Sequence, residues 1–238
     1  MSSPTRYPNG VTNVGPRDPM KMLKVPDPTL MHVFYDDFDR YVAGDWTITA
    51  VGTGTSALGD ADGGALVVTT SALENDGRQH QKVGESFLLA SGKQAMFKAK
   101  FKLDDATQSD ILIGLAVTDT TLIVAAGDGV TDGIFFQKDD GVATLDFYCQ
   151  KDTTTGQLST TSVATLADGI YVTAAWYYDG VSSVEYYING VHKGTLALTS
   201  TPSAYLPDTE LTVSFAVLAG AAAAKALTLD YILAALER

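Results

Sequence analysis

The sequence predicts an all-β domain, a sandwich or barrel of short antiparallel strands, behind an extended N-terminal arm. Short apolar or alternating runs are separated by Gly, Asp, Asn and Ser, the spacing expected of such folds. No long amphipathic helix interrupts these runs, and six of the eight prolines fall within the first 31 residues. A chain of 238 residues is compatible with one large β domain and does not require a second.

The arm is predicted to span residues 1–32. Proline lacks an amide hydrogen and moves the preceding residue out of the α region, so this segment is expected to run extended. The arm carries a net charge of +2, which leaves −14 for the rest of a chain whose net charge is −12. Its apolar content favours an arm that becomes ordered on a partner. The candidate contact residues in it are Arg6, Tyr7, Pro8, Asn9, Val11, Val14, Met20, Met22 and Leu23.

The domain is predicted to span residues 33–238. The clearest strand is AMFKAKFKL, in which three lysines alternate with apolar residues, so one face is expected in water and the other in the core. Asn189-Gly190 predicts a type I′ hairpin turn, because both central positions need positive φ. The expected strands are 33–38, 46–51, 64–70, 85–90, 95–103, 111–118, 133–138, 143–150, 161–166, 170–179, 183–188, 192–198, 211–218 and 226–234.

The last of these strands is ambiguous, because Leu229, Ile232, Leu233 and Leu236 also fit helical spacing. We predict a strand, since Leu227, Leu229, Tyr231 and Leu233 alternate with smaller or polar residues. The preceding apolar segment, residues 211–227, is expected to form core or a subunit interface.

Composition restricts the function classes. A net charge of −12 opposes binding to phosphate backbones and to anionic membranes, so neither nucleic acid nor membrane is expected as a partner. The opening residues lack the apolar segment of a secretory signal, and no stretch has about 18 consecutive apolar residues. The single cysteine, Cys149, excludes an intrachain disulfide and is interpreted as a small buried hydrophobe.

Adjacent acidic residues raise the question of glycoside hydrolysis. Two carboxylates that act on one sugar from a strand must lie two residues apart, whereas adjacent residues point to opposite faces. The Glu-x-Asp-x-x-Glu pattern of jelly-roll glucanases is absent. The pairs are therefore expected at turns and on the surface, and no enzymatic activity is predicted; they are Asp36-Asp37, Asp104-Asp105 and Asp139-Asp140.

No metal or other cofactor is predicted. Asp60-x-Asp62-Gly63 resembles the opening of a calcium loop, but Ser71 stands where an EF-hand-like loop needs glutamate, so only a weaker site stays open. The three histidines, His32, His80 and His192, are far apart and lack metal-ligand spacing, which favours surface or strand-edge positions.

An aromatic cluster has two interpretations. Exposed rings stack on sugars in carbohydrate-binding sandwiches, whereas cross-strand aromatic pairing across the Asp179 turn explains the same residues without a ligand and is favoured. The cluster consists of Trp176, Tyr177, Tyr178, Tyr186 and Tyr187.

Several segments resemble known families. FYDDFDRYVAGDWTIT, the pair WYYDG and YYING, and the closing LDYILAALER resemble the concanavalin A-like, laminin-G-type jelly-roll family, whose members are antiparallel two-sheet sandwiches. RYPNGVTNV, KVPDPTLMHVFYDDFD and DYILAALER resemble head decoration or minor capsid proteins of tailed bacteriophages. Fold by itself assigns no function.

The second resemblance implies a virion structural protein on the capsid exterior that binds the major capsid protein, expected as a homotrimer. In that interpretation the arm lies along neighbouring capsid subunits and many copies on the lattice add avidity. Two alternatives stay open. One is a lectin-like carbohydrate-binding module on the phage surface, and the other is a jelly-roll glycoside hydrolase, which the missing acidic pattern disfavours.

Overall fold

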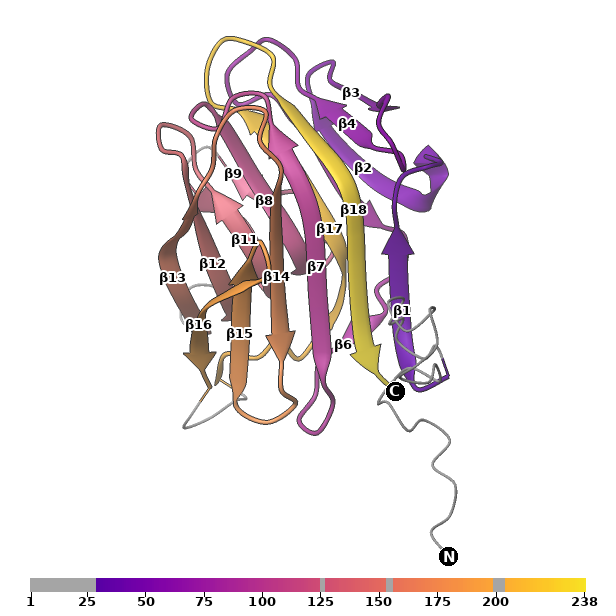
Figure 1. The fold of residues 1–238 in the computed structure, drawn as a ribbon, viewed down its shortest axis with the longest axis vertical. Coiled ribbons are helices and arrows are strands. Elements are labelled where there is room, and N and C mark those ends of the chain that lie inside the picture. The colour runs from indigo at the N-terminus through magenta and orange to yellow at the C-terminus, as the bar shows by residue number, and fades with distance from the viewer. Residues whose placement is uncertain (1–28, 125–126, 153–155, 199–203) are drawn as a thin grey trace, which may run out of the picture.

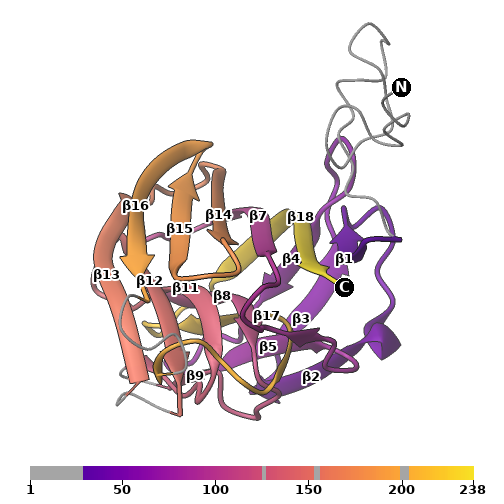
Figure 2. The ribbon, with the colours of Figure 1, turned by 90° about the horizontal axis from the view of Figure 1, so that it is seen from below.

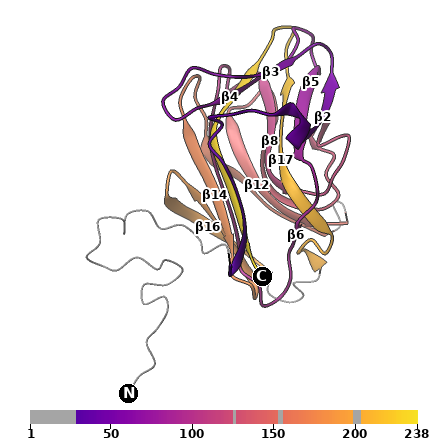
Figure 3. The same cartoon turned by 90° about the vertical axis from the view of Figure 1, so that its right-hand side faces the viewer.

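Two antiparallel β-sheets stack face to face in the computed structural model, which describes residues 29–124, 127–152, 156–198 and 204–238. Figure 1 looks onto the first sheet, here called sheet A, and Figure 3 shows the two layers from the side. Within the described residues sheet A has eight strands. Their order is β16 (Val191–Ala197), β15 (Ser183–Ile188), β14 (Val172–Tyr178), β7 (Ala95–Leu103), β18 (Ala226–Glu237), β4 (Leu66–Thr69) and β3 (Thr55–Leu58), with β1 (Met31–Asp36) also paired to β18.

Sheet B, the second layer, also has eight strands in the described part of the chain. Their order is β13 (Gly156–Thr165), β12 (Thr144–Lys151), β11 (Gly133–Lys138), β8 (Ser109–Ala116), β17 (Glu210–Ala219), β5 (Gly77–Lys82) and β2 (Trp46–Val51), with β6 (Phe87–Leu88) also paired to β17. A 3-10 turn, η2 (Ala43–Asp45), precedes β2, and β9 (Ile123–Val124) pairs with β10 (Gly127–Asp128) outside both sheets.

The main core fills the space between the sheets with aromatic and aliphatic side chains. Phe97 on β7 stacks on Trp176 on β14, with ring centroids 6.2 Å apart. Phe147 on β12 of sheet B meets Tyr186 on β15 of sheet A at 5.0 Å. Removing one such buried aromatic ring costs about 3–5 kcal/mol of stability. The Phe97–Trp176 stack lies within sheet A, and the Phe147–Tyr186 contact joins the two layers.

The two sheets differ on their outer faces. Along β7 every second residue is buried and the others are partly exposed, so sheet A has one face in the core and one in water. Along β8, β11 and most of β17 consecutive residues are buried. The outer face of sheet B is therefore covered in its centre, and the covering segment contains β9.

Most strand predictions are confirmed, and four have the observed bounds: 46–51, 95–103, 133–138 and 183–188. Asn189 and Gly190 have φ values of 52° and 76°, as the hairpin prediction requires. The C-terminal segment forms a strand rather than a helix. Its predicted alternation is wrong beyond Leu229, because a β-bulge before Tyr231 brings Ile232 and Ala234, rather than Tyr231 and Leu233, into the core.

The first strand begins earlier than predicted. β1 starts at Met31 and forms an edge of sheet A, where it pairs along the last part of β18. The backbone oxygen of Leu30 also accepts a hydrogen bond from Arg238, at 3.0 Å. The described chain therefore enters the sandwich beside its C-terminus (Figure 1). Within the described residues no helix has the length and apolarity needed to cross a membrane.

Candidate functional site

Residues 117–124 and 127–132, together called the strap here, cross the outer face of sheet B. Figure 2 shows β9, which belongs to the strap, on the side of sheet B that faces away from sheet A. Beneath it lies a second apolar cluster, separate from the main core. This cluster is formed by Leu112, Ala116, Leu122, Ile123, Val130, Phe135, Ala216 and Leu218, with Tyr148 packed against it.

Two glutamine side chains of β5 hold the start of the strap. The amide of Gln81 donates to the backbone oxygen of Val117 at 2.9 Å and accepts from the backbone N–H of Asp119 at 2.8 Å. Gln79 accepts from the backbone N–H of Leu122 at 2.7 Å and donates to the oxygen of Thr120. Each amide thus satisfies a donor and an acceptor of a non-helical segment, which keeps buried backbone groups paired.

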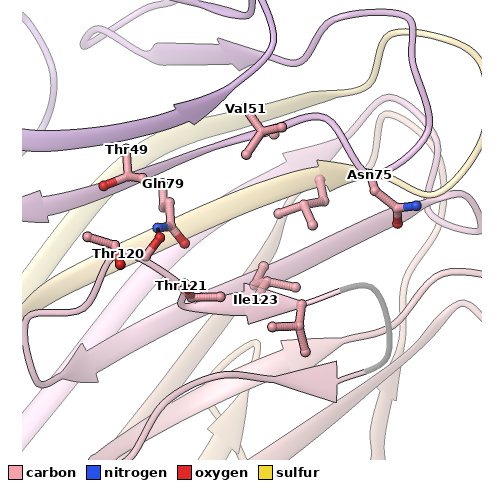
Figure 4. Close-up of a pocket in the computed structure, with 10 residues that line it drawn as sticks. Thr49, Val51, Asn75, Gln79, Thr120, Thr121 and Ile123 are labelled. Atoms are coloured by element: carbon pink, nitrogen blue, oxygen red, sulfur yellow. Dashed lines mark hydrogen bonds between the residues drawn. The ribbon is translucent and has the colours of Figure 1, made fainter.

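A pocket of about 280 Å³ lies where the strap meets the edge of sheet B. Figure 4 shows Thr49, Gln79 and Thr120 together at one end of it and Asn75 at the other. β2 and β5 supply one wall, the strap supplies the opposite wall, and Leu218 comes from β17. The lining residues are Thr49, Val51, Asn75, Gly77, Gln79, Thr120, Thr121, Ile123, Val124 and Leu218.

The pocket lining combines uncharged polar groups with apolar walls. No lysine, arginine, aspartate, glutamate or histidine is among these lining residues. Within the described residues, the hydroxyls of Thr49 and Thr121 and the amide of Asn75 have no hydrogen-bond partner. They remain available to a ligand, while Val51, which is 58% exposed, offers apolar surface at the rim. Such a site suits a neutral molecule with several hydroxyl groups.

Gly77 on β5 lets the pocket lining pack closely on Leu218 of β17. A Cβ atom at this position would lie 2.6 Å from the backbone oxygen of Val217 and 2.7 Å from the side chain of Leu218. Only glycine allows β5 to approach β17 this closely without displacing Leu218.

The arrangement most similar to a catalytic dyad lies elsewhere, inside the sandwich. The Oγ of Ser56 on β3 is 2.9 Å from Nε2 of His80 on β5, and the Nε of Arg78 donates to the same Oγ at 2.9 Å. A nucleophilic serine needs a base that a third group orients. Here the buried Nδ1 of His80 has no partner within the described residues, and burial lowers the pKa of His80 to about 3.

His80 also corrects a sequence prediction. We expected all three histidines at the surface or at strand edges, and His32 on β1 and His192 on β16 lie on edge strands. His80 instead is 0% exposed and stacks on Phe215 in the main core. The polar run GRQHQK, which contains it, was not expected to form a strand at all.

The acidic pairs have structural roles where hydrogen bonds are seen. Asp36 accepts from the backbone N–H of Phe38 at 2.9 Å, and Asp104 accepts from that of Ala226 at 2.7 Å. Asp105 forms a salt bridge of 2.6 Å with Lys225. Around Asp60 and Asp62, as elsewhere in the described chain, no group of three His, Cys, Asp or Glu side chains is placed to hold a metal ion.

The aromatic cluster divides between the two faces of sheet A. Trp176, Tyr178 and Tyr186 are buried in the core, which agrees with the packing interpretation. Tyr177 and Tyr187 point to the outer face and are partly exposed.

The candidate arm residues, Arg6 to Leu23, lie outside the described residues. The pocket was not predicted, since its walls come from segments distant in sequence.

Known structures with the same architecture were found despite low sequence identity. An endo-β-1,4-glucuronan lyase from the fungus Trichoderma reesei has a TM-score of 0.57 at 12% identity, over 86% of this chain and 94% of that one. Peanut lectin has a TM-score of 0.60 at 13% identity, over 87% of this chain and 97% of the lectin. A protein of unknown function from Shewanella oneidensis MR-1 has a TM-score of 0.59 at 12% identity, over 95% of this chain and 97% of that protein.

These likenesses show the fold. The chain is an all-β sandwich of two antiparallel sheets with a concanavalin A-like fold, as the sequence predicted. No protein-family model matches the chain. No curated protein matches it by sequence either.

Proposed function

We propose that this protein is a lectin-like carbohydrate-binding protein. Its neutral saccharide ligand is held in the pocket between the strap and the edge of sheet B. The observation that carries the proposal is the lining of that pocket, where free hydroxyl and amide groups stand beside apolar walls without any charged side chain. A pyranose ring has the complementary surface, with hydroxyls around its edge and C–H groups on its faces. A volume of about 280 Å³ accommodates a ligand of one or two sugar rings.

The fold neighbours support a carbohydrate ligand in general. One of them is named as a lectin and another as a lyase of a glucuronan, so this architecture holds sugars in proteins of different activity. The identities of 12% and 13% carry no residue of those sites over to this chain. The ligand class therefore rests on the pocket chemistry of this chain together with the fold.

The proposed activity is binding without catalysis. General acid–base chemistry on a glycosidic bond needs two carboxyl groups that flank it. The pocket lining has none, and Ser56 and His80 lie inside the sandwich without a third group to orient the imidazole. The purified protein is accordingly expected not to hydrolyse β-glucans or other polysaccharides.

The experiment is a screen of neutral glycans followed by calorimetry with the best binder. Thr49→Val combined with Thr121→Val removes two hydroxyls and keeps the side-chain shape, so affinity should fall about tenfold with little change in Tm. Thr47→Val is the matched control, because Thr47 lies on the same strand outside the pocket lining. Absence of any neutral binder, or equal affinity of the double variant and the wild type, would refute the proposal.

A second candidate function is capsid attachment through the N-terminal arm. It is favoured by the charge contrast between the arm, at +2, and the acidic remainder of a chain with net charge −12. The arm is followed by β1, which lies at an edge of sheet A. The residues of β1 do not line the pocket, which lies on sheet B. The partner would be the major capsid protein of a tailed bacteriophage, at the outer surface of the virion.

Deleting residues 1–28 tests attachment, because β1 then remains complete. The shortened protein should keep its cooperative melting yet fail to sediment with capsids that bind the full chain. Tyr7→Ala and Met22→Asp should weaken sedimentation without lowering Tm. A homotrimer predicts a light-scattering mass of three 25.2 kDa chains. Equal capsid binding with and without the arm would refute this role.

A further inference from the structure

The outer face of sheet A carries a row of lysines on an acidic protein. Lys98, Lys100 and Lys102 point outward from β7, which lies inside the sheet between β14 and β18. These strands face the viewer in Figure 1, and no described segment crosses over them there. The lysines are spaced two residues apart, about 6.8 Å each, so the row is roughly 14 Å long.

Tyrosine rings flank this row on both sides. The Nζ of Lys98 lies 5.7 Å from the ring centroid of Tyr231 on β18. The Nζ atoms of Lys100 and Lys102 lie 4.9 and 4.8 Å from the ring centroid of Tyr171, just before β14. Cation–π contacts at these distances hold the ammonium groups beside the rings without neutralising their charge. We call these five residues the Lys–Tyr face.

Two of the three charges are not neutralised by a neighbour. Lys100 forms a salt bridge of 2.8 Å with Asp230. For Lys98 and Lys102, no carboxylate of the described residues lies within salt-bridge distance. The sequence carries a net charge of −12, so two unpaired lysines at the centre of an open sheet are a local exception to the overall charge.

We propose that the Lys–Tyr face binds an acidic polysaccharide, a chain of sugar rings that carries carboxylate or sulfate groups. The two free ammonium groups provide charge-assisted hydrogen bonds to such anions. The rings of Tyr171 and Tyr231 provide flat apolar surface with a polar edge, on which sugar rings can pack. This surface belongs to sheet A and shares no residue with the pocket on sheet B, so it is a second, independent site.

The charge balance distinguishes this ligand from nucleic acid. Duplex DNA carries about one negative charge per 1.7 Å, and an acidic protein with two free cations on this face would repel it. A polyuronate carries one carboxylate on each sugar ring, a much lower charge density than that of duplex DNA, so the two unpaired lysines can bind carboxylates of separate rings. An acidic protein partner fits less well, because lysine is depleted from the centres of protein–protein interfaces.

The test measures binding of polygalacturonate to the full-length protein by calorimetry at about 20 and 300 mM NaCl. Affinity should fall at the higher salt concentration, because the interaction is largely electrostatic. Lys98→Gln combined with Lys102→Gln should lower the affinity about tenfold. Lys93→Gln combined with Lys193→Gln, which changes two exposed lysines outside β7, is the charge-matched control and should bind within about twofold of the wild type.

Three further measurements complete the test. Tyr171→Leu should weaken polygalacturonate binding at both salt concentrations, since it removes stacking surface and no charge. The Thr49→Val and Thr121→Val variant should bind polygalacturonate normally, so the two sites can fail separately. Equal binding of the two lysine double variants, or stronger binding of single-stranded DNA or polyglutamate than of polygalacturonate, would overturn the proposal.

Discussion

The imidazole of His80 lies almost parallel to the ring of Phe215, with centroids 4.7 Å apart and an angle of 11° between the planes. Phe215 is on β17 and His80 on the neighbouring β5, and both side chains point into the main core. The stack places an ionisable group in apolar surroundings, where its charged form is strongly disfavoured. Arg78 beside it acts in the same direction.

Stability should consequently fall in acid because of His80. Burial lowers its pKa from 6.5 to about 3, so the unfolded chain takes up a proton below pH 6.5 that the folded protein excludes. The stability that the neutral His80 contributes is fully present above pH 6.5. It is lost as the pH falls below that value, by up to about 1.4 kcal/mol of unfolding free energy per pH unit. His80→Phe, which keeps an aromatic ring against Phe215, should flatten this part of the profile.

The measurement is urea unfolding of both proteins between about pH 3.5 and 7.5. The difference in free energy of unfolding between wild type and variant should change with pH only below about 6.5. Parallel profiles over the whole range would show that His80 does not carry the effect.

Asp110 on β8 should have the opposite pH dependence. Burial raises the pKa of its carboxyl from 3.8 to about 6, against the lowering effect of the hydrogen bond from the backbone N–H of Asp140. The folded protein therefore binds a proton more tightly than the unfolded chain, and stability falls as the pH rises from about 4 to 6. Asp110→Asn keeps the acceptor oxygen and removes the charge, so it should stabilise the protein at pH 7 by about 1–3 kcal/mol.

Thermal unfolding at pH 7 and at pH 4 checks this prediction. The gain from Asp110→Asn should be larger at pH 7, where the wild-type carboxyl is ionised. Asp39→Asn changes an exposed carboxylate and is the control, with an expected effect within about 0.5 kcal/mol. A loss of stability at pH 7 would contradict the proposed burial penalty.

The thiol of Cys149 should be unreactive in the folded protein. It is fully buried in the main core, where burial raises its pKa to about 12. Alkylation requires a thiolate that the reagent can reach. The raised pKa keeps Cys149 protonated, and its burial keeps the reagent away. Iodoacetamide at pH 8 should leave the native protein unmodified by mass spectrometry and add one group in urea. Modification of the native protein at the rate of a free thiol would refute this.

The strands that sequence predicts well are those whose pattern is local. AMFKAKFKL alternates over its full length, because one face contacts the core and the other water. The hairpin between β15 and β16 was also predictable, since Asn189 and Gly190 both adopt positive φ. In these cases the information lies within a few residues of the element itself.

Features that sequence did not predict depend on distant contacts. β5, GRQHQK, reads as a polar segment, yet Gln79 and Gln81 are buried because the strap, about 40 residues later in the chain, pairs with their amides. The bulge in β18 reverses which side chains face the core after Leu229. The pocket joins β2, β5, the strap and β17, so no single segment contained its signal.

The strap itself provides the last prediction, which links stability to the proposed saccharide site. Gln81 is 2% exposed and its amide bonds to Val117, Asp119 and the hydroxyl of Ser214. Gln81→Leu keeps the approximate size but leaves these buried groups without their partner, at a cost of about 2–4 kcal/mol. Gln94→Leu changes an exposed glutamine and is the control.

Hydrogen exchange should locate the effect. The amide of Asp119, which donates to Gln81, should exchange faster in Gln81→Leu than in Gln94→Leu. Amides of β7 and β14 in sheet A should be accelerated only by as much as the global loss of stability requires. Because the strap forms one wall of the pocket, neutral saccharide binding should weaken in the same variant, whereas polygalacturonate binding to the Lys–Tyr face should persist. Unchanged exchange at Asp119 would mean that the strap is held mainly by its apolar underside rather than by the glutamine amides.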